Sequence, residues 1–191
     1  MKSLLSIITG LAVFCGLALS SSAQVNTAVE MDEQLLDKFA STQQVEANAA
    51  AIEIFKRGEK MMPLLLRQKG NTSLFYGNFN LDPPAMFIWL PTGDKIRDKK
   101  LSKDGLLTTM EVASLFMINA IFYKDMDFAQ TSYLVDLSLP SEQQKAANKS
   151  YLVKKAWNAV EIWSQKLEKE GIKKLRESRT PPFNDSDIRF Y

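Results

Sequence analysis

The chain has 191 residues, of which 46% are hydrophobic and 24% charged, and its formal net charge at pH 7 is only +2. It contains no histidine and a single cysteine. The lack of histidine excludes Ser-His-Asp triads, Cys-His dyads and histidine-based zinc or haem sites. The near-neutral balance gives no reason to expect a nucleic-acid partner, because such binding needs a concentrated basic surface.

Residues 1–23 follow the order of a secretory signal peptide. Lys2 supplies the positive start, the run from Leu4 to Leu19 is apolar, and small residues lead up to Ala23. We expect cleavage after Ala23, which leaves residues 24–191 as a single helical domain in the periplasm or outside the cell. The apolar run is shorter than the roughly 20 residues that cross a bilayer, so we do not expect the cleaved chain to span a membrane.

Cys15 lies inside this apolar run and follows Phe14. A lipidated cysteine normally follows a small residue, so we do not expect a lipid anchor. Cleavage removes the only cysteine, and a domain of this size can rely on its hydrophobic core without disulfides. This pattern favours a bacterial periplasm over an animal extracellular space. Only carboxylate, lysine, tyrosine or serine-lysine chemistry then remains. We expect no cofactor and no metal, because no residue pattern points to either.

Apolar residues recur every three or four positions through residues 29–57, which predicts a helix. Residues 59–68, which are rich in methionine and leucine, are a second, short predicted helix. Ser41 and Gln44 have the spacing of a capping box. The first region is therefore either one long helix or two helices in tandem. Gly58 is expected to end it.

Residues 107–123 are apolar on almost every side, which predicts a helix that other helices bury. Thr108 and Glu111 have the spacing of a second capping box. Residues 150–170 carry a clear apolar stripe, and Gly171 fits a Schellman ending with one or two further helical turns after it.

The predicted fold class is all-α, as a helical bundle or as HEAT-like helix pairs, with an irregular insertion at residues 71–105. Glycines, prolines and aromatic residues are frequent in this insertion. Residues 86–90 have the pattern of a strand and residues 91–94 that of a turn. The insertion is therefore a candidate for a β-hairpin.

Residues 58–66 read Gly-Glu-Lys-Met-Met-Pro-Leu-Leu-Leu, with a proline that fits only the first turn of a helix. This run resembles the start of the second helix of a HEAT-type repeat. The later chain has an apolar helix from Thr108, a helix with Trp157 and Trp163, and a tail at 183–191 that is apolar enough to dock on the body. It is similar to uncharacterised exported bacterial helical proteins. The resemblance implies a helix-pair architecture and no functional residues.

The candidate binding residues lie in two groups in the insertion. The aromatic group can line a groove for a partner chain or a glycan, or pack under the helices as part of the core; it comprises Tyr76, Phe79, Phe87 and Trp89. The basic group can contact anionic headgroups or an acidic partner, or form a solvated loop; it comprises Lys95, Arg97, Lys99 and Lys100.

Five carboxylates flank apolar segments, namely Glu53, Glu59, Glu111, Asp125 and Asp127. A glycoside hydrolase needs two carboxyl groups roughly 5 to 10 Å apart across a cleft. The sequence fixes no such pair, since the capping box accounts for Glu111 and a turn after the helix accounts for the two aspartates.

These observations favour a non-enzymatic exported binding protein, of which inhibitor- or immunity-type proteins are examples. Its partner is then another envelope protein or a cell-wall component. One alternative is a carboxylate-based hydrolase of cell-wall glycan, and a second is a structural envelope protein that self-associates.

The interpretation predicts that changing Tyr76 and Trp89 to alanine abolishes capture of the partner and leaves the helical content intact, because aromatic side chains dominate interface energetics. Capture on the immobilised protein and circular dichroism measure the two effects. Capture that survives in folded protein contradicts the assignment of the site to residues 71–105.

Overall fold

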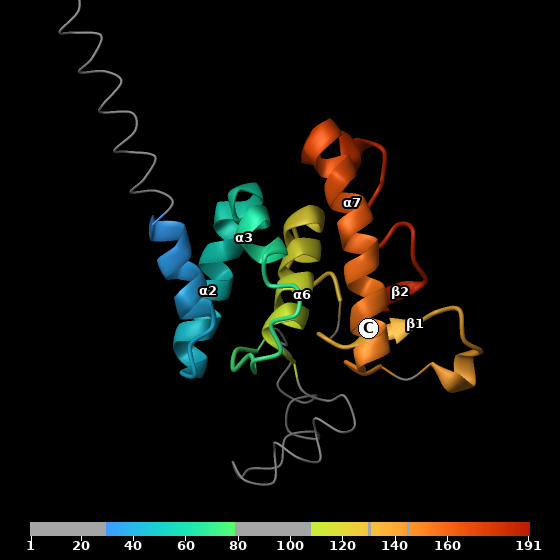
Figure 1. Cartoon of the computed structure of the whole chain (residues 1–191), viewed down its shortest axis with the longest axis horizontal. Helices are drawn as coiled ribbons and strands as arrows, with labels where there is room; N and C mark the ends of the chain where they lie inside the picture. Colours follow the sequence, from blue (N-terminus) through green and yellow to red (C-terminus); the bar gives the residue numbers. More distant parts are fainter. Residues whose placement is uncertain (1–29, 79–107, 130, 145) are drawn as a thin grey trace, which may run out of the picture.

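The computed structural model describes residues 30–78, 108–129, 131–144 and 146–191. In this part the chain is mostly helical, with a small two-stranded antiparallel sheet that the sequence did not suggest (Figure 1). No described helix is both long enough and apolar enough to cross a membrane. The predicted signal peptide, and the strand, turn and basic run predicted in the insertion, lie outside the described residues.

The helical region predicted at 29–57 is two helices in tandem. The first covers residues 30–39, and α2 covers Gln44–Arg57. The predicted capping box is wrong, because the N-cap of α2 is Gln43, which makes no side-chain cap. The hydroxyl of Ser41 instead accepts the N–H of Gln43 at 3.1 Å and closes a local turn.

Gly58 ends α2 as predicted, with a φ of 63° and its N–H bonded to the carbonyl of Ile54. A 3-10 turn, η1 (Gly58–Met61), leads into the short helix α3 (Met62–Leu66). Pro63 stands in the first turn of α3, where a missing N–H breaks no helical hydrogen bond. The second predicted helix is therefore present, but as two shorter pieces.

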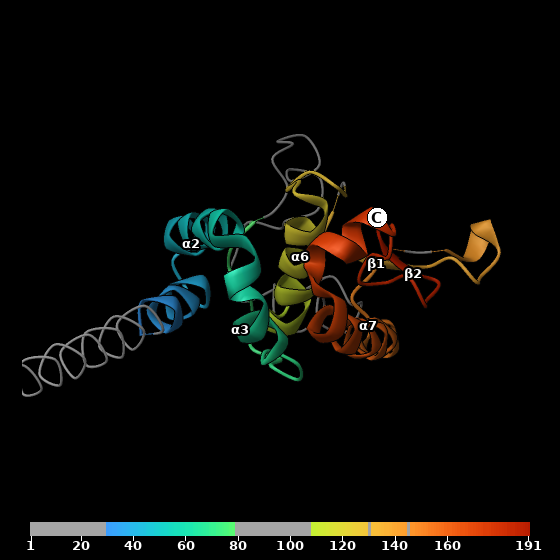
Figure 2. The same cartoon turned by 90° about the horizontal axis from the view of Figure 1, so that it is seen from above.

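The centre of the described structure is α6 (Met110–Tyr123), in which every residue from Val112 to Phe122 is buried. Both views place α6 between α2 and α3 on one side and α7 on the other (Figures 1 and 2), and α6 contacts all three. The prediction of a helix enclosed by others is confirmed.

The capping box predicted at the start of α6 is wrong. Thr109 is the N-cap and makes no side-chain cap. A carboxylate oxygen of Glu111 accepts the N–H of Gly70 at 3.1 Å, and the hydroxyl of Thr108 pairs with that of Ser132 at 3.0 Å. Both side chains therefore bond to neighbouring segments instead of capping the start of α6.

Helix α7 (Ser150–Glu177) starts where the sequence predicts, and Trp157 and Trp163 lie in its buried stripe. Gly171 interrupts the helix with φ 74° and ψ 155°, a conformation that is essentially restricted to glycine. This ψ differs from that of a Schellman ending, so that part of the prediction is wrong. The helix does continue for further turns after Gly171, as predicted.

The tail docks on the body, as predicted, and it does so as a strand. β1 (Leu134–Asp136) pairs antiparallel with β2 (Ile188–Phe190), and the register places Val135 opposite Arg189. A 3-10 turn, η2 (Ser141–Gln143), follows β1. Both strands contact α7, and the sheet forms a small ribbon beside that helix (Figure 1).

Aromatic rings join the ribbon to the central helix. The ring of Phe116 on α6 lies 4.8 Å from that of Phe128 and 5.3 Å from that of Phe190. Phe183 lies 5.6 Å from Phe190 within the tail. The tail is therefore part of the core around α6.

Arg176 on α7 binds the carboxyl end of α6. It donates from Nε to the carbonyl of Phe122 at 2.8 Å and from Nη2 to that of Ile121 at 2.7 Å. Its Nη1 donates to Glu59 at 3.1 Å. The last carbonyls of a helix lack helical partners and carry partial negative charge, so this guanidinium satisfies them and ties α6, α7 and η1 together.

Replacing Arg176 with methionine is expected to lower the free energy of unfolding by about 1.5–3 kcal/mol, because charge-assisted hydrogen bonds to buried carbonyls are lost. Arg176→Lys should retain only part of this stability, since an ammonium group cannot reproduce the planar hydrogen-bonding geometry of a guanidinium. Urea denaturation measures both. Lys174→Met, at an exposed site on the same helix, is the control, and equal losses in Lys174→Met and Arg176→Met contradict the clamp.

Candidate functional site

The described surface has an open hollow of ≈ 620 Å³ beside the β1–β2 ribbon. It lies where the ribbon meets the loop after α6 and the segment around η2. Nine residues line it, and apolar side chains predominate: Phe128, Ala129, Val135, Leu137, Ser141, Gln144, Arg189, Phe190 and Tyr191. We call it the ribbon hollow. A concave surface with mostly apolar walls and few polar groups is typical of binding sites.

Exposed apolar side chains gather at the ribbon hollow. Leu137 is 48% exposed and Tyr191 is 58% exposed. Tyr123, 46% exposed, stacks on the wall residue Phe128 with ring centroids 5.4 Å apart. These aromatic and aliphatic side chains are in contact with water. A ligand that covers them removes apolar surface from water, which favours binding.

Arg189 supplies the positive charge of the ribbon hollow. Its Nη1 donates to the carbonyls of Phe183, Ser186 and Ile188 at 2.8, 2.7 and 2.6 Å. Within the described residues no carboxylate lies within ion-pair distance of this guanidinium. Three carbonyls that converge on one nitrogen fix the orientation of the guanidinium and leave its charge without a counter-ion.

Strand register explains why Arg189 faces the hollow. Side chains alternate between the two faces of a strand, and Ile188 is fully buried on the face toward the helices. Arg189 therefore points to the opposite face, next to its cross-strand neighbour Val135. Arg189 also acts on the nearby Tyr123. Burial raises the pKa of Tyr123, and the positive charge of Arg189 opposes this rise.

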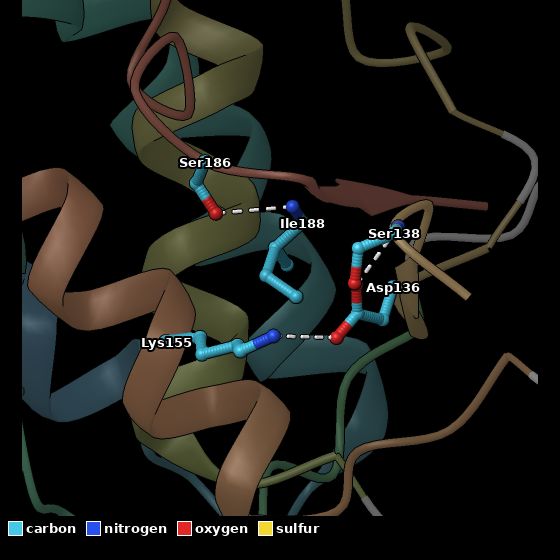
Figure 3. A network of polar contacts seen from close by, with 5 residues as sticks. All are labelled: Asp136, Ser138, Lys155, Ser186 and Ile188. Carbon is cyan, nitrogen blue, oxygen red and sulfur yellow. Dashed lines mark hydrogen bonds and ion pairs between the residues drawn. The ribbon is translucent and has the colours of Figure 1, made fainter.

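A polar cluster lies on the inner face of the ribbon (Figure 3). One carboxylate oxygen of Asp136 accepts from Lys155 of α7 at 2.7 Å, and the other accepts the N–H of Ser138 at 3.0 Å and the Ser138 hydroxyl. The side chain of Asp136 is only 3% exposed. Close by, the hydroxyl of Ser186 accepts the N–H of Ile188 at 3.0 Å.

This cluster anchors the ribbon and is unsuited to serine-lysine catalysis. Such catalysis needs a neutral lysine that accepts a proton from the serine. Here the hydrogen bond to Asp136 raises the pKa of Lys155, so Lys155 stays protonated. The Lys155 hydrogen bond, followed by those from Ser138, lowers the pKa of Asp136. Both charges are therefore kept, and β1 is fixed to α7.

Of the eight binding residues predicted from the sequence, the structure describes Tyr76. It is exposed, whereas the adjacent Phe75 is buried and its ring lies 4.8 Å from that of Phe39. The N–H of Asn78 donates to the side-chain oxygen of Asn48 on α2 at 2.6 Å. The other seven lie outside the described residues: Phe79, Phe87, Trp89, Lys95, Arg97, Lys99 and Lys100.

Four of the five candidate carboxylates have hydrogen-bond partners within the described structure. Glu53 accepts from Arg57 at 3.2 Å, and Glu59 and Glu111 accept from Arg176 and Gly70 as described above. Asp125 accepts the N–H of Asp127 at 2.8 Å, which confirms the predicted turn after the helix. No carboxylate is among the described residues that line the ribbon hollow.

In the described ranges no three histidine, cysteine, aspartate or glutamate side chains gather in a way that could hold a metal ion. The residues of the ribbon hollow were not predicted as a site. Their only signal was the apolar tail, because strands of three residues are too short to show a period-2 pattern.

Comparison of the chain with protein-family models, with curated proteins and with solved structures found no match in any of the three.

The stabilising effect of Asp136 is expected to depend on pH. Because its pKa is lowered on folding, the pair with Lys155 stabilises the fold above the ordinary carboxyl value of about 3.9, and this contribution is lost as the pH falls below it. The destabilisation by Asp136→Asn should therefore be largest near pH 7 and become smaller as the pH falls below the ordinary carboxyl value. Urea denaturation of both proteins from pH 7 to pH 3 measures the difference.

Asp127→Asn, at an exposed aspartate, is the control and should change stability little at any pH. A destabilisation by Asp136→Asn that is the same at pH 7 and pH 3 contradicts the ion-pair assignment.

Proposed function

We propose that this chain is an exported, non-enzymatic binding protein that holds its partner in the ribbon hollow. The partner is another envelope protein or a cell-wall component. The observation that carries the proposal is the combination, in one concavity, of exposed apolar side chains with a guanidinium that has no carboxylate partner among the described residues. The export part of the proposal rests on the signal-peptide pattern of residues 1–23.

Hydrogen bonds hold the walls of the ribbon hollow in place, which supports its role as a binding site. The N–H of Tyr191 donates to the carbonyl of Tyr133 at 2.9 Å, and the carbonyl of Tyr191 accepts from Thr131 at 2.7 Å. The side chain of Gln144 donates to the carbonyl of Leu139 at 2.8 Å. Walls that are already fixed lose little conformational entropy when a ligand binds, which favours affinity.

The same proposal includes a HEAT-like pairing of α2 with α3. The two helices follow one another through η1, and both contact α6. Such a pair would serve as a scaffold on the side of α6 opposite the ribbon.

The proposal predicts that Leu137→Glu combined with Tyr191→Ala abolishes capture of a partner from envelope extract, because the double variant removes apolar contact area and adds a repelling charge. Each immobilised variant is incubated with the extract and washed with salt, and the retained material is identified. Ile162→Glu changes a comparably exposed apolar residue on α7, outside the hollow, and is the matched control.

Two further outcomes are informative. Loss of capture only in the Tyr76→Ala, Trp89→Ala double variant would move the site to the insertion predicted from the sequence. Equal retention by every variant, each with wild-type helical content, would contradict a binding role for the ribbon hollow.

A further inference from the structure

We infer that the ribbon hollow takes an acidic peptide segment of a partner protein, in which an aspartate or glutamate stands beside an apolar side chain. The inference rests on the proposed binding function and names the chemistry of the partner. It is argued from the charge of Arg189, the character of the walls and the state of the ribbon edges.

Arg189 brings a permanent positive charge to the ribbon hollow. A guanidinium is charged at every physiological pH and presents donors in a planar fork that fits a carboxylate. The carbonyls of residues 183, 186 and 188 all bind Nη1 of Arg189, and neither Nε nor Nη2 donates a hydrogen bond to any described residue. Donors therefore remain for an incoming anion, and the carbonyls hold the group in place.

The apolar walls of the ribbon hollow favour an apolar side chain next to the acidic group of the ligand. Phe128, Val135, Leu137 and Phe190 offer aromatic and aliphatic surface. Besides Arg189, the polar side-chain groups of the lining are those of Ser141 and Gln144 and the hydroxyl of Tyr191. A sugar ring carries hydroxyl groups around its rim and needs several hydrogen-bonding partners, more than the few polar groups of this lining supply. An apolar side chain needs none, and burying it against these walls gains about 25 cal/mol per Å². The walls therefore favour a peptide with a Leu- or Phe-like residue over a glycan.

The ribbon edges indicate that side chains, and not an added strand, make the contact. On β1, Leu134 donates to the side chain of Asn148 at 3.3 Å and accepts from Ala147 at 2.9 Å. On β2, the backbone N–H and carbonyl of Ile188 are taken by Ser186 and Arg189. Strand addition needs free backbone groups along an edge, and these contacts already occupy both edges at those positions.

The test is selection of random linear peptides, displayed on phage, against the immobilised full chain. Enriched peptides should carry aspartate or glutamate next to leucine, phenylalanine or tyrosine. Synthetic copies with the acid changed to its amide should bind at least roughly tenfold more weakly, and binding of the acidic copies should weaken as salt is raised.

Leu137→Glu should reduce binding of the acidic peptides by at least roughly tenfold, since it places a carboxylate in the ribbon hollow, which Arg189 also lines. Tyr191→Ala should reduce it through lost apolar contact. Ile162→Glu should leave it unchanged. Both hollow variants alter exposed side chains, so circular dichroism should show wild-type helical content.

Three results would overturn the inference: no enriched peptide, enriched peptides without an acidic residue, or acidic peptides that bind the Leu137→Glu variant as well as the wild type. Soluble peptidoglycan fragments are the comparison probe. If they bind and the hollow variants abolish this, the proposed function stands and the ligand is a glycan. If neither peptides nor fragments bind, and no variant affects capture from the extract, the proposed function fails as well.

Discussion

The residues of α6 from Val112 to Phe122 are all buried, so this helix needs apolar surface around its whole circumference. No single partner helix can supply that. α2 and α3 cover one side and α7 the other, and the tail adds Phe190 against Phe116. The arrangement of the described chain follows from this requirement, because each of these elements places apolar side chains in the same core.

Enclosure of α6 also forms the ribbon hollow. Phe128 and Phe190 pack on Phe116 and at the same time line the hollow. The walls of the hollow are thus part of the packed core, and this packing keeps them rigid. A site built on a packed core is better preorganised than one on a loop that stands away from the body.

Polar contacts fix the positions that apolar packing leaves free. Arg176 binds the carbonyl end of α6 and Glu59, and the pair of Asp136 with Lys155 holds β1 on α7. Hydrophobic contact is non-directional, whereas these hydrogen bonds have narrow geometry. They therefore set how α7, η1 and the ribbon are oriented around a core that would tolerate small rotations.

The sequence by itself determined the helical class, the buried character of α6, the stop at Gly58, the place of Pro63 and the core positions of Trp157 and Trp163. These follow from periodicity and backbone restriction, which are local properties of the chain. Local patterns failed at both capping boxes, because Ser41 closes a local turn with the N–H of Gln43 and Glu111 bonds to the N–H of Gly70, which the fold brings near.

Only the tertiary structure decided the pairing of β1 with β2, since the strands are some fifty residues apart and three residues long. The ribbon hollow has the same origin. Its lining comes from four separate segments, and the charge of Arg189 matters there only because pairing with Val135 turns it to the outer face. A pattern of single residues cannot report such a site, because its chemistry arises from contacts between distant parts of the chain.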